Sequence, residues 1–225
     1  MSDIRIERPP DLRHPDSSWL ASLGSPRLRH AASSGLGAVF WLLFAYANIK
    51  ASIESHRVLG MGVGVLGLWA AVLFVVRRPP QLVSRRLPEW LVALAGTFGA
   101  SLLRPGGGNP GWIDPLGLTL QGLGIALGVC GYMALGRSLG LVPANRGLVT
   151  SGIYRIVRHP LYASYVIAEL GYLIQSPRLW NLGVLVVVWA CQIGRIVSEE
   201  RLLSTDREYR LYSERTPWRL LPGLW

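Results

Sequence analysis

Long apolar runs alternate with short polar segments along this chain. The apolar runs fall at about 35–50, 58–76, 88–103, 115–136, 160–175 and 179–197. Most of them approach the roughly 20 residues that a helix needs to cross a bilayer. The fifth is short because it begins directly after His159-Pro160, and proline is tolerated in the first turn of a helix. The pattern predicts an all-α, polytopic integral membrane protein with about six transmembrane helices.

The polar segments divide the chain into three parts. Residues 1–34 contain four prolines and no apolar core of a signal peptide, so we expect a polar, poorly ordered cytoplasmic tail. Residues 35–136 form a four-helix membrane region without a diagnostic motif. Residues 137–225 hold the last helical hairpin and a polar C-terminal segment, and we expect any catalytic chemistry to lie there.

The charges change this picture by giving it an orientation. Only 16% of the residues are charged, yet the net charge is +10. With six spans, 19 basic residues lie on one side of the membrane and four on the other, and the positive-inside rule places the richer side in the cytoplasm. We therefore expect a protein of the inner membrane of a bacterium, with both of its termini in the cytoplasm. No nucleic-acid partner is expected, because the arginines lie between apolar runs rather than on one soluble face.

Two other features favour ordinary packing over a binding site. Residues 62–67 read G-V-G-V-L-G, which matches a dinucleotide fingerprint, but no strand precedes them. We interpret these glycines, and the pair Gly124 and Gly128, as small residues that allow close helix packing. Cys130 and Cys191 both lie in apolar runs, so neither a disulfide framework nor a metal site is expected.

Two polar clusters stand out against the apolar background. The first runs from Gly147 to Tyr162, and the second is R-I-V-S-E-E-R at 195–201. They flank one helical hairpin, so folding the hairpin brings them together. Arg195 and Glu199 are four residues apart and share a helix face. They could form a simple ion pair at the membrane boundary. However, Glu200 adds a second carboxylate beside Glu199, and two adjacent carboxylates near lipid are costly unless a cationic or hydrogen-bonding ligand meets them.

Each residue of the first cluster also has a purely structural interpretation. His159 can cap the step from loop to helix. Tyr154 and Tyr162 can be interfacial aromatics of the kind that border membrane helices.

Taken together, the clusters resemble a known family. The run L-V-T-S-G-I-Y-R-I-V-R-H-P-L-Y is followed about 35 residues later by R-I-V-S-E-E-R-L-L and then by Y-R-L-Y-S-E-R-T-P-W-R-L-L-P. This arrangement is similar to that of the integral-membrane methyltransferases, namely the isoprenylcysteine carboxyl methyltransferases and their phospholipid methyltransferase relatives. The resemblance covers roughly residues 136–222.

The resemblance implies a binding site for S-adenosylmethionine under a cytoplasmic C-terminal segment. By motif match, the cofactor-binding residues would be Arg146, Gly147, Leu148, Val149, Tyr154, His159, Pro160, Leu161, Tyr162, Glu199 and Glu200. Arg195 would face the acceptor and, with Glu199, form the catalytic pair. Ile153 stands where the family commonly has proline, and Ala163-Ser164 where it commonly has glycine. These departures affect the expected acceptor more than the expected cofactor.

The resemblance also implies the reaction. We expect methyl transfer to a lipophilic acceptor at the cytoplasmic face of the membrane, in the first place to a carboxylate oxygen. Transfer to a phospholipid amine or a small thiol is the alternative within the enzyme class. A non-catalytic membrane transporter or assembly partner is the alternative of another class. No metal is expected in any of these.

A stripe of polar residues along the fifth apolar run predicts where the acceptor lies. Tyr162, Tyr165, Glu169 and Tyr172 share one helix face, and Glu169 falls near the bilayer centre, where a carboxyl group is expensive. The stripe either lines the acceptor channel, together with Arg195, or contains a protonated Glu169 that is hydrogen-bonded to a neighbouring helix.

Overall fold

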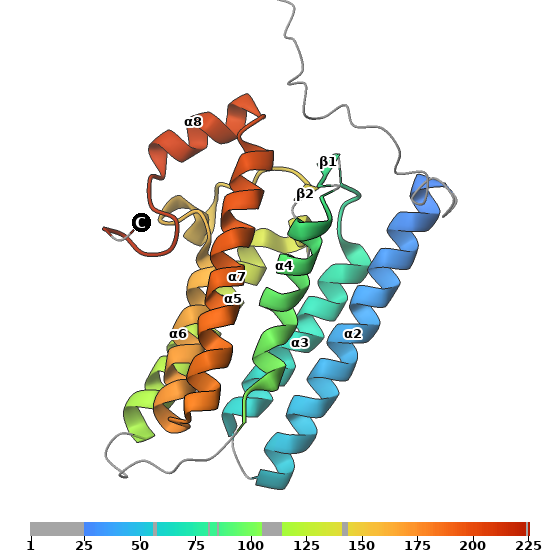
Figure 1. The fold of residues 1–225 in the computed structure, drawn as a ribbon. Helices are drawn as coiled ribbons and strands as arrows, with labels where there is room; N and C mark the ends of the chain where they lie inside the picture. The colour runs from blue at the N-terminus through green and yellow to red at the C-terminus, as the bar shows by residue number, and fades with distance from the viewer. Residues whose placement is uncertain are drawn as a thin grey trace, which may run out of the picture.

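The computed structural model describes residues 25–55, 58–80, 82–84, 86–104, 114–140, 144–223 and 225. Its helices are α2 (Pro26–Ser55), α3 (Val58–Val76), α4 (Leu87–Phe98), α5 (Asp114–Leu135), α6 (Pro160–Gln175), α7 (Leu179–Leu203) and α8 (Arg207–Arg215). Short 3₁₀ turns follow α4 at Gly99–Leu102 and α5 at Gly136–Ser138, and a third covers Gly152–Arg155. Six long helices form a bundle, and the short α8 lies across one end of it (Figure 1).

The six long helices coincide with the six apolar runs, which confirms the prediction of an all-α, polytopic membrane protein. Three of them contain stretches long and apolar enough to cross a membrane, at His30–Glu54, Pro115–Ser138 and Leu179–Leu203. Shorter apolar helical stretches cover Met61–Val76 and Leu87–Leu102. A 16-residue helix such as α6 still extends about 24 Å, at 1.5 Å per residue.

Helix α2 begins at Pro26, earlier than the apolar run predicted, so part of the predicted tail is helical. A tertiary contact holds the end of this extension that adjoins the apolar run. Arg77 donates hydrogen bonds from Nε to the Ser34 hydroxyl at 2.9 Å and from Nη2 to the Ser33 hydroxyl at 2.7 Å. Such partners are invisible to an apolar pattern. The tail before residue 25 lies outside the described residues.

Glycines bring the helices of the bundle together, as predicted. A Cβ atom on Gly124 of α5 would lie 2.7 Å from Cβ of Ala168 and 2.8 Å from the carbonyl oxygen of Ser164, both on α6. In the other hairpin, a Cβ on Gly67 of α3 would lie 3.2 Å from Cβ of Ala45 on α2. The G-V-G-V-L-G run therefore serves helix packing, since only glycine permits so short an approach between backbones.

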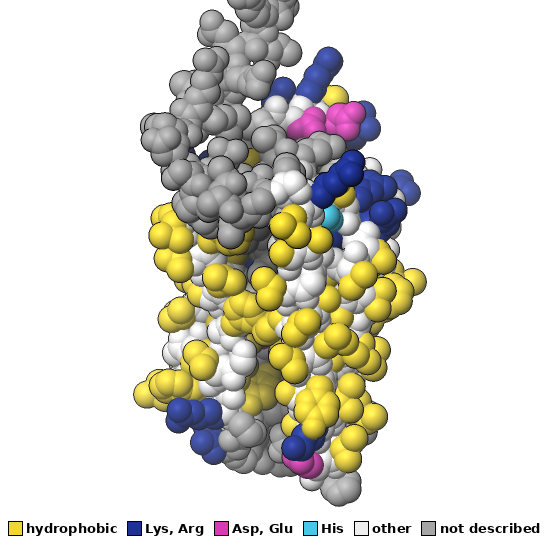
Figure 2. Space-filling model, turned by 90° about the vertical axis from the view of Figure 1, so that its right-hand side faces the viewer, with side chains coloured by type: hydrophobic (Ala, Val, Ile, Leu, Met, Phe, Trp, Pro, Cys, Tyr) yellow, Lys and Arg dark blue, Asp and Glu magenta, His cyan; other side chains and the backbone are white. Residues whose placement is uncertain are grey.

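The outer surface of the bundle is apolar, as a lipid-facing surface must be. Leu36, Leu43 and Tyr46 of α2 are each more than 60% exposed. Figure 2 shows hydrophobic side chains over the middle of the molecule, with lysine and arginine gathered toward its ends and most densely at one of them. The densely basic end is the one that carries α8 and the polar clusters.

Three connections hold this basic end together. A two-residue strand β1 (Leu82–Val83) pairs antiparallel with β2 (Ala144–Asn145). The backbone amides of Arg158 and His159 donate to the carbonyl oxygens of Trp218 and Arg219 at 2.9 and 2.8 Å. As a result, the C-terminal segment lies against the loop before α6, at the same end as β1 and β2 (Figure 1).

Candidate active site

One pocket opens at the basic end of the bundle, where the two polar clusters meet. The sequence-predicted residues among its lining are Arg146, Gly147, Leu148, Val149, Tyr154, His159, Leu161, Tyr162, Tyr165, Arg195 and Glu199. The hairpin of α6 and α7 therefore brings together two segments that are about 35 residues apart in sequence. Pro160, Glu200, Glu169 and Tyr172 are not part of this lining.

A short hydrogen bond joins the two clusters. The Tyr162 hydroxyl donates to Oε1 of Glu199 at 2.6 Å. Pro160 begins α6, so Tyr162 lies in its first turn, at the pocket end of the helix. Both side chains are largely shielded from water, and the bond holds the Glu199 carboxylate at the pocket wall.

His159 lies between the two adjacent carboxylates. Its Nε2 is 3.1 Å from Oε1 of Glu200, and its Nδ1 is 3.9 Å from Oε2 of Glu199. His159 occupies the N-cap position of α6, yet its side chain makes no capping hydrogen bond. His159 is thus the N-cap residue by position, but its ring contacts the second polar cluster rather than the backbone of α6.

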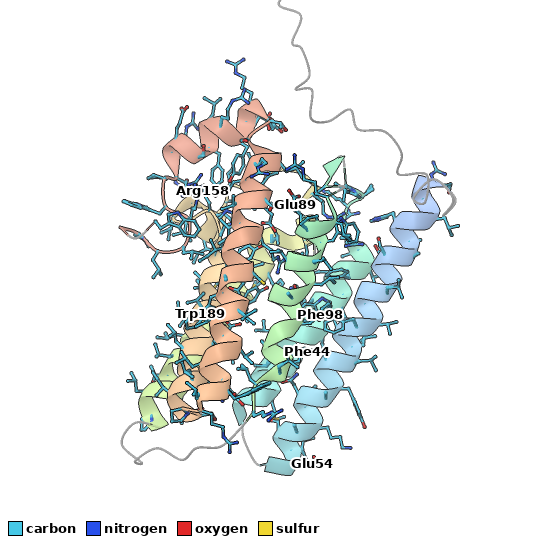
Figure 3. The ribbon with its side chains drawn as sticks, viewed as in Figure 1. Phe44, Glu54, Glu89, Phe98, Arg158 and Trp189 are labelled. Carbon is cyan, nitrogen blue, oxygen red and sulfur yellow. The ribbon has the colours of Figure 1, made fainter. Side chains whose placement is uncertain are left out.

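Glu200 belongs to an ion cluster beside the pocket. Its carboxylate is 3.2 Å from Nη1 of Arg158 and accepts a 2.8 Å hydrogen bond from Nε of Arg219. Figure 3 shows Arg158 at the end of the bundle, beneath α8. Glu200 thereby ties the C-terminal segment to the loop before α6. The two neighbouring carboxylates have separate surroundings, since Glu199 faces the pocket and Glu200 is satisfied by arginines.

Arg195 lies deeper along α7, with only 7% of its surface exposed. Its Nη1 donates to the Thr97 hydroxyl of α4 at 2.9 Å, and its Cζ lies 5.1 Å from the centre of the Tyr162 ring. A Cβ on Gly96 would lie 3.3 Å from Cδ of Arg195. Helix α4 therefore supports the arginine both by a hydrogen bond and by leaving room for its side chain.

Tyrosines form much of the remaining wall. The Tyr212 hydroxyl donates to the carbonyl oxygen of Tyr154 at 2.7 Å. The hydroxyl of Tyr165 is 3.0 Å from that of Tyr132, which lies behind the lining. Burial raises the pKa of Tyr212 to about 12 and also raises the pKa of Tyr154. These phenols stay neutral at physiological pH, so they offer aromatic surface and hydrogen bonds rather than charge.

Glu169 and Tyr172 lie outside the pocket wall. Oε2 of Glu169 accepts a 2.7 Å hydrogen bond from the indole of Trp189, and Oε1 accepts one from Gln192 at 3.4 Å. Trp189 lies well along α7, away from the basic end (Figure 3). Glu169 is thus hydrogen-bonded to the neighbouring helix, as the alternative interpretation of the polar stripe describes.

Sequence reasoning missed several residues of the pocket. They are Leu135, Ser138, Leu139, Gly140, Ala144, Arg158, Leu203, Tyr209 and Tyr212. Arg158 and the two tyrosines left a signal. Arg158 lies within the first polar cluster, and Tyr209 and Tyr212 are three residues apart and share the inner face of α8, where both are buried. The apolar members look like any other membrane residue in the sequence.

Comparison with known proteins places this geometry in context. Residues 113–210 match the family model described as phospholipid methyltransferase. The chain is 31% identical over 143 residues to the cobalt-zinc-cadmium resistance protein CzcN of Cupriavidus metallidurans, covering 60% of this chain and 63% of that protein.

Two plant proteins give similar matches. Protein-S-isoprenylcysteine O-methyltransferase B of Arabidopsis thaliana is 35% identical over 115 residues, covering 47% of this chain and 58% of the relative. Protein-S-isoprenylcysteine O-methyltransferase A of the same plant is 32% identical over 110 residues, covering 46% and 55%. The chain thus spans less than two thirds of the length of each of these relatives.

The matched region contains both polar clusters and most of the pocket wall. The family model and the two plant relatives agree with the resemblance that the clusters carry. Residues 113–210 are thus similar to the phospholipid methyltransferase family model, and the two plant relatives point to the same group of integral-membrane methyltransferases.

Proposed function

We propose that this protein is an S-adenosylmethionine-dependent methyltransferase that modifies a lipophilic acceptor at the cytoplasmic face of the membrane. As the acceptor group we propose a carboxylate, as in O-methylation of the isoprenylcysteine type. The main support is that His159, Tyr162, Arg195 and Glu199, from two distant clusters, line one pocket at the basic end of the bundle.

The pocket wall suits the proposed cofactor by its chemistry. The Glu199 carboxylate and the rings of Tyr154 and Tyr162 favour a cationic group, since carboxylates and aromatic faces both attract cations. The apolar side chains of Leu135, Leu139, Leu148, Leu161 and Leu203 suit a flat purine ring. When bound, S-adenosylmethionine supplies a methyl group on a positively charged sulfur, which is already a strong electrophile.

The residues of the chain then have two tasks, alignment and exclusion of water. Tyr162 fixes the Glu199 carboxylate through its 2.6 Å hydrogen bond. Arg195 holds a carboxylate acceptor by charge-assisted hydrogen bonds. Because an ionised carboxylate carries no proton to be removed, the site needs no general base for this acceptor.

The C-terminal segment supplies the barrier to water. It is attached to the loop before α6 by the amides of Arg158 and His159 and by the ion pairs of Glu200. Tyr212 of α8 adds the hydrogen bond to Tyr154. A lipophilic acceptor would then enter from the bilayer side, between the ends of the helices.

Binding and transfer can be measured on the detergent-purified protein. We expect the protein to bind radiolabelled S-adenosylmethionine and to transfer its methyl group to a component of a lipid extract. Glu199→Gln removes the carboxylate charge but keeps the shape, so affinity for the cofactor should fall about tenfold to a hundredfold.

Glu214→Gln is the matched control, because Glu214 is an exposed carboxylate of α8. This variant should bind like the parent protein. Binding that is absent in the parent, or equal in the Glu199 and Glu214 variants, would contradict the proposal. The methylated atom in the product, oxygen, nitrogen or sulfur, decides among the three acceptor classes.

The proposed orientation has its own test. Ser204, just after α7, and Ser101, near the other end of the bundle, are both exposed. In a cysteine-free background, Ser204→Cys should react with a membrane-impermeant thiol reagent only after cells are opened, and Ser101→Cys already in intact cells with a permeable outer envelope. The reverse pattern would place the pocket outside the cytoplasm.

A further inference from the structure

Three arginines gather at one edge of the pocket. Arg77 and Arg78 follow α3, and Arg146 follows β2. The pairing of β1 with β2 brings the two loops together. Nη1 of Arg146 donates to the carbonyl oxygen of Arg78 at 2.7 Å, and the amide of Arg78 donates to the carbonyl oxygen of Arg137 at 2.8 Å. The loop after α3 is thereby attached to the wall of the pocket.

Arg146 is the arginine of this group that lines the pocket. It is only 6% exposed, and its buried Nε has no hydrogen-bond partner among the described residues. An arginine that merely extends toward lipid headgroups would keep its guanidinium in water. A buried guanidinium with an unsatisfied N–H is costly unless a ligand completes its hydrogen bonds.

Arg77 and Arg78 add positive charge, and none of the ion pairs between described residues supplies them with a carboxylate. Arg77 is 6% exposed, and its partners are the hydroxyls of Ser33 and Ser34 and the ring of Phe74, at 4.6 Å. These partners are all neutral. In the described part of the chain, the ion pairs involve none of the three arginines. Burial and the nearby charge of Arg77 lower the pKa of Arg146 to about 10, so Arg146 is still charged at neutral pH.

Gly147 allows the Arg78 guanidinium to come close to the pocket wall. Its φ is +99°, a conformation that residues with a side chain rarely adopt. A Cβ atom there would lie 3.2 Å from Nη1 of Arg78. The Arg78 guanidinium therefore lies against the backbone of the pocket wall, next to Arg146.

The opposite edge of the pocket differs in charge balance. There Arg158 and Arg219 share the carboxylate of Glu200. At the Arg146 edge, the described residues supply no anionic partner for the positive charge. Guanidinium groups match carboxylates and phosphates in both charge and geometry.

We infer that Arg146, backed by Arg77 and Arg78, forms a binding site for an oxyanion at this edge of the pocket. The oxyanion is a carboxylate or a phosphate. The source of the oxyanion rests on the proposed function. It is either the amino-acid carboxylate of S-adenosylmethionine or an anionic headgroup of the lipophilic acceptor.

Direct binding distinguishes the two sources. The probes are S-adenosylmethionine, its decarboxylated analogue, and dodecyl phosphate in neutral detergent micelles. If the cofactor carboxylate occupies the site, the parent protein should bind S-adenosylmethionine at least tenfold more tightly than the decarboxylated analogue, and Arg146→Gln should abolish this difference. If a headgroup occupies it, Arg146→Gln should leave the affinity for S-adenosylmethionine unchanged and lower that for dodecyl phosphate at least tenfold.

Two further variants guard against a folding artefact. Arg78→Gln changes an exposed side chain and should weaken binding of the same probe about threefold. Arg155→Gln, an exposed arginine of the neighbouring loop that does not line the pocket, should bind every probe like the parent protein. Unchanged affinities for all three probes in both Arg146→Gln and Arg78→Gln would overturn the inference.

The result is separable from the proposed function. A parent protein that binds dodecyl phosphate through Arg146 but not S-adenosylmethionine would support the oxyanion site and contradict the methyltransferase. If the parent protein binds S-adenosylmethionine but the Arg146 and Arg78 variants bind every probe equally well, the result would support the methyltransferase and contradict the oxyanion site.

Discussion

Helices α5–α8 and helices α2–α4 contribute to the pocket in different ways. The first group carries the polar clusters and falls within or beside the region that matches the methyltransferase family. The second group has no such motif, yet it supplies Thr97 to Arg195 and places Arg77 and Arg78 beside Arg146. The C-terminal helices and their loops thus carry the pocket wall, whereas α4 and the loop after α3 contact two of its arginines, Arg195 and Arg146.

The largest effect should come from disturbing the α5–α6 contact that supports the pocket. Gly124→Leu would place a side chain against the α6 backbone, because even a Cβ atom at this position would lie 2.8 Å from the Ser164 carbonyl oxygen. We expect a loss of about 3 kcal/mol of stability, as for overpacked cores. Thermal unfolding in detergent measures it. Gly122→Leu on the same helix is the control, since nothing lies within 4 Å of a Cβ there.

The next effect concerns Arg195, where the two groups of helices meet. Arg195→Ala should reduce turnover about a hundredfold, the equivalent of roughly 2.7 kcal/mol for a lost charge-assisted contact to the acceptor. Binding of S-adenosylmethionine should stay near the parent value. Isothermal titration and single-turnover assays separate the two quantities. A loss confined to cofactor affinity would mean that Arg195 serves only Glu199.

A smaller effect should follow from removing the support that α4 gives to Arg195. Thr97→Val deletes the hydroxyl that accepts the 2.9 Å hydrogen bond, so turnover should fall about tenfold, or roughly 1.4 kcal/mol. Thr97→Ser keeps the hydroxyl and should restore activity. Thr119→Val is the matched control. The hydroxyls of Thr97 and Thr119 each donate to the carbonyl oxygen four residues earlier in their helices, but Thr119 is exposed. Equal activity of the Val and Ser variants would mean that the hydrogen bond from Arg195 to Thr97 of α4 does not contribute to turnover.

The smallest effect is expected at Glu169, away from the pocket. Glu169→Gln keeps an acceptor for the Trp189 indole, so stability should change by about 1 kcal/mol or less, as for other hydrogen bonds between membrane helices. The preference among acceptors should not change. Competition between two acceptor lipids measures it, and a shifted preference at normal cofactor affinity would instead support the acceptor channel predicted from the polar stripe.

The sequence predicted those features that depend on local pattern. The apolar runs located the six long helices, and Pro160 marked the start of α6. The helical hairpin indicated that the two polar clusters would come together, but not which of their side chains would meet. The separate surroundings of Glu199 and Glu200 were not predictable, because they depend on where Arg158 and Arg219 lie in the folded chain.

The residues contributed by α2–α4 could not be predicted for the same reason. Thr97 is an ordinary helix residue in the sequence, and its role follows from the packing of α4 against α7. Arg77 and Arg78 read as positive-inside arginines, and only the β1–β2 pairing brings them to Arg146. The contact of Arg77 with Ser33 and Ser34, which joins α2 to the loop after α3, is likewise absent from any local pattern.

The pairing of residues 158–159 with 218–219 has a consequence for biosynthesis. The amides of Arg158 and His159 find their acceptors about 60 residues later in the chain. The ribosome must therefore complete α6 and α7 before Trp218 and Arg219 exist. During that interval the loop amides and Glu200 lack their final partners. A chain that ended before Trp218 would lack both acceptors that hold the C-terminal segment against the loop before α6.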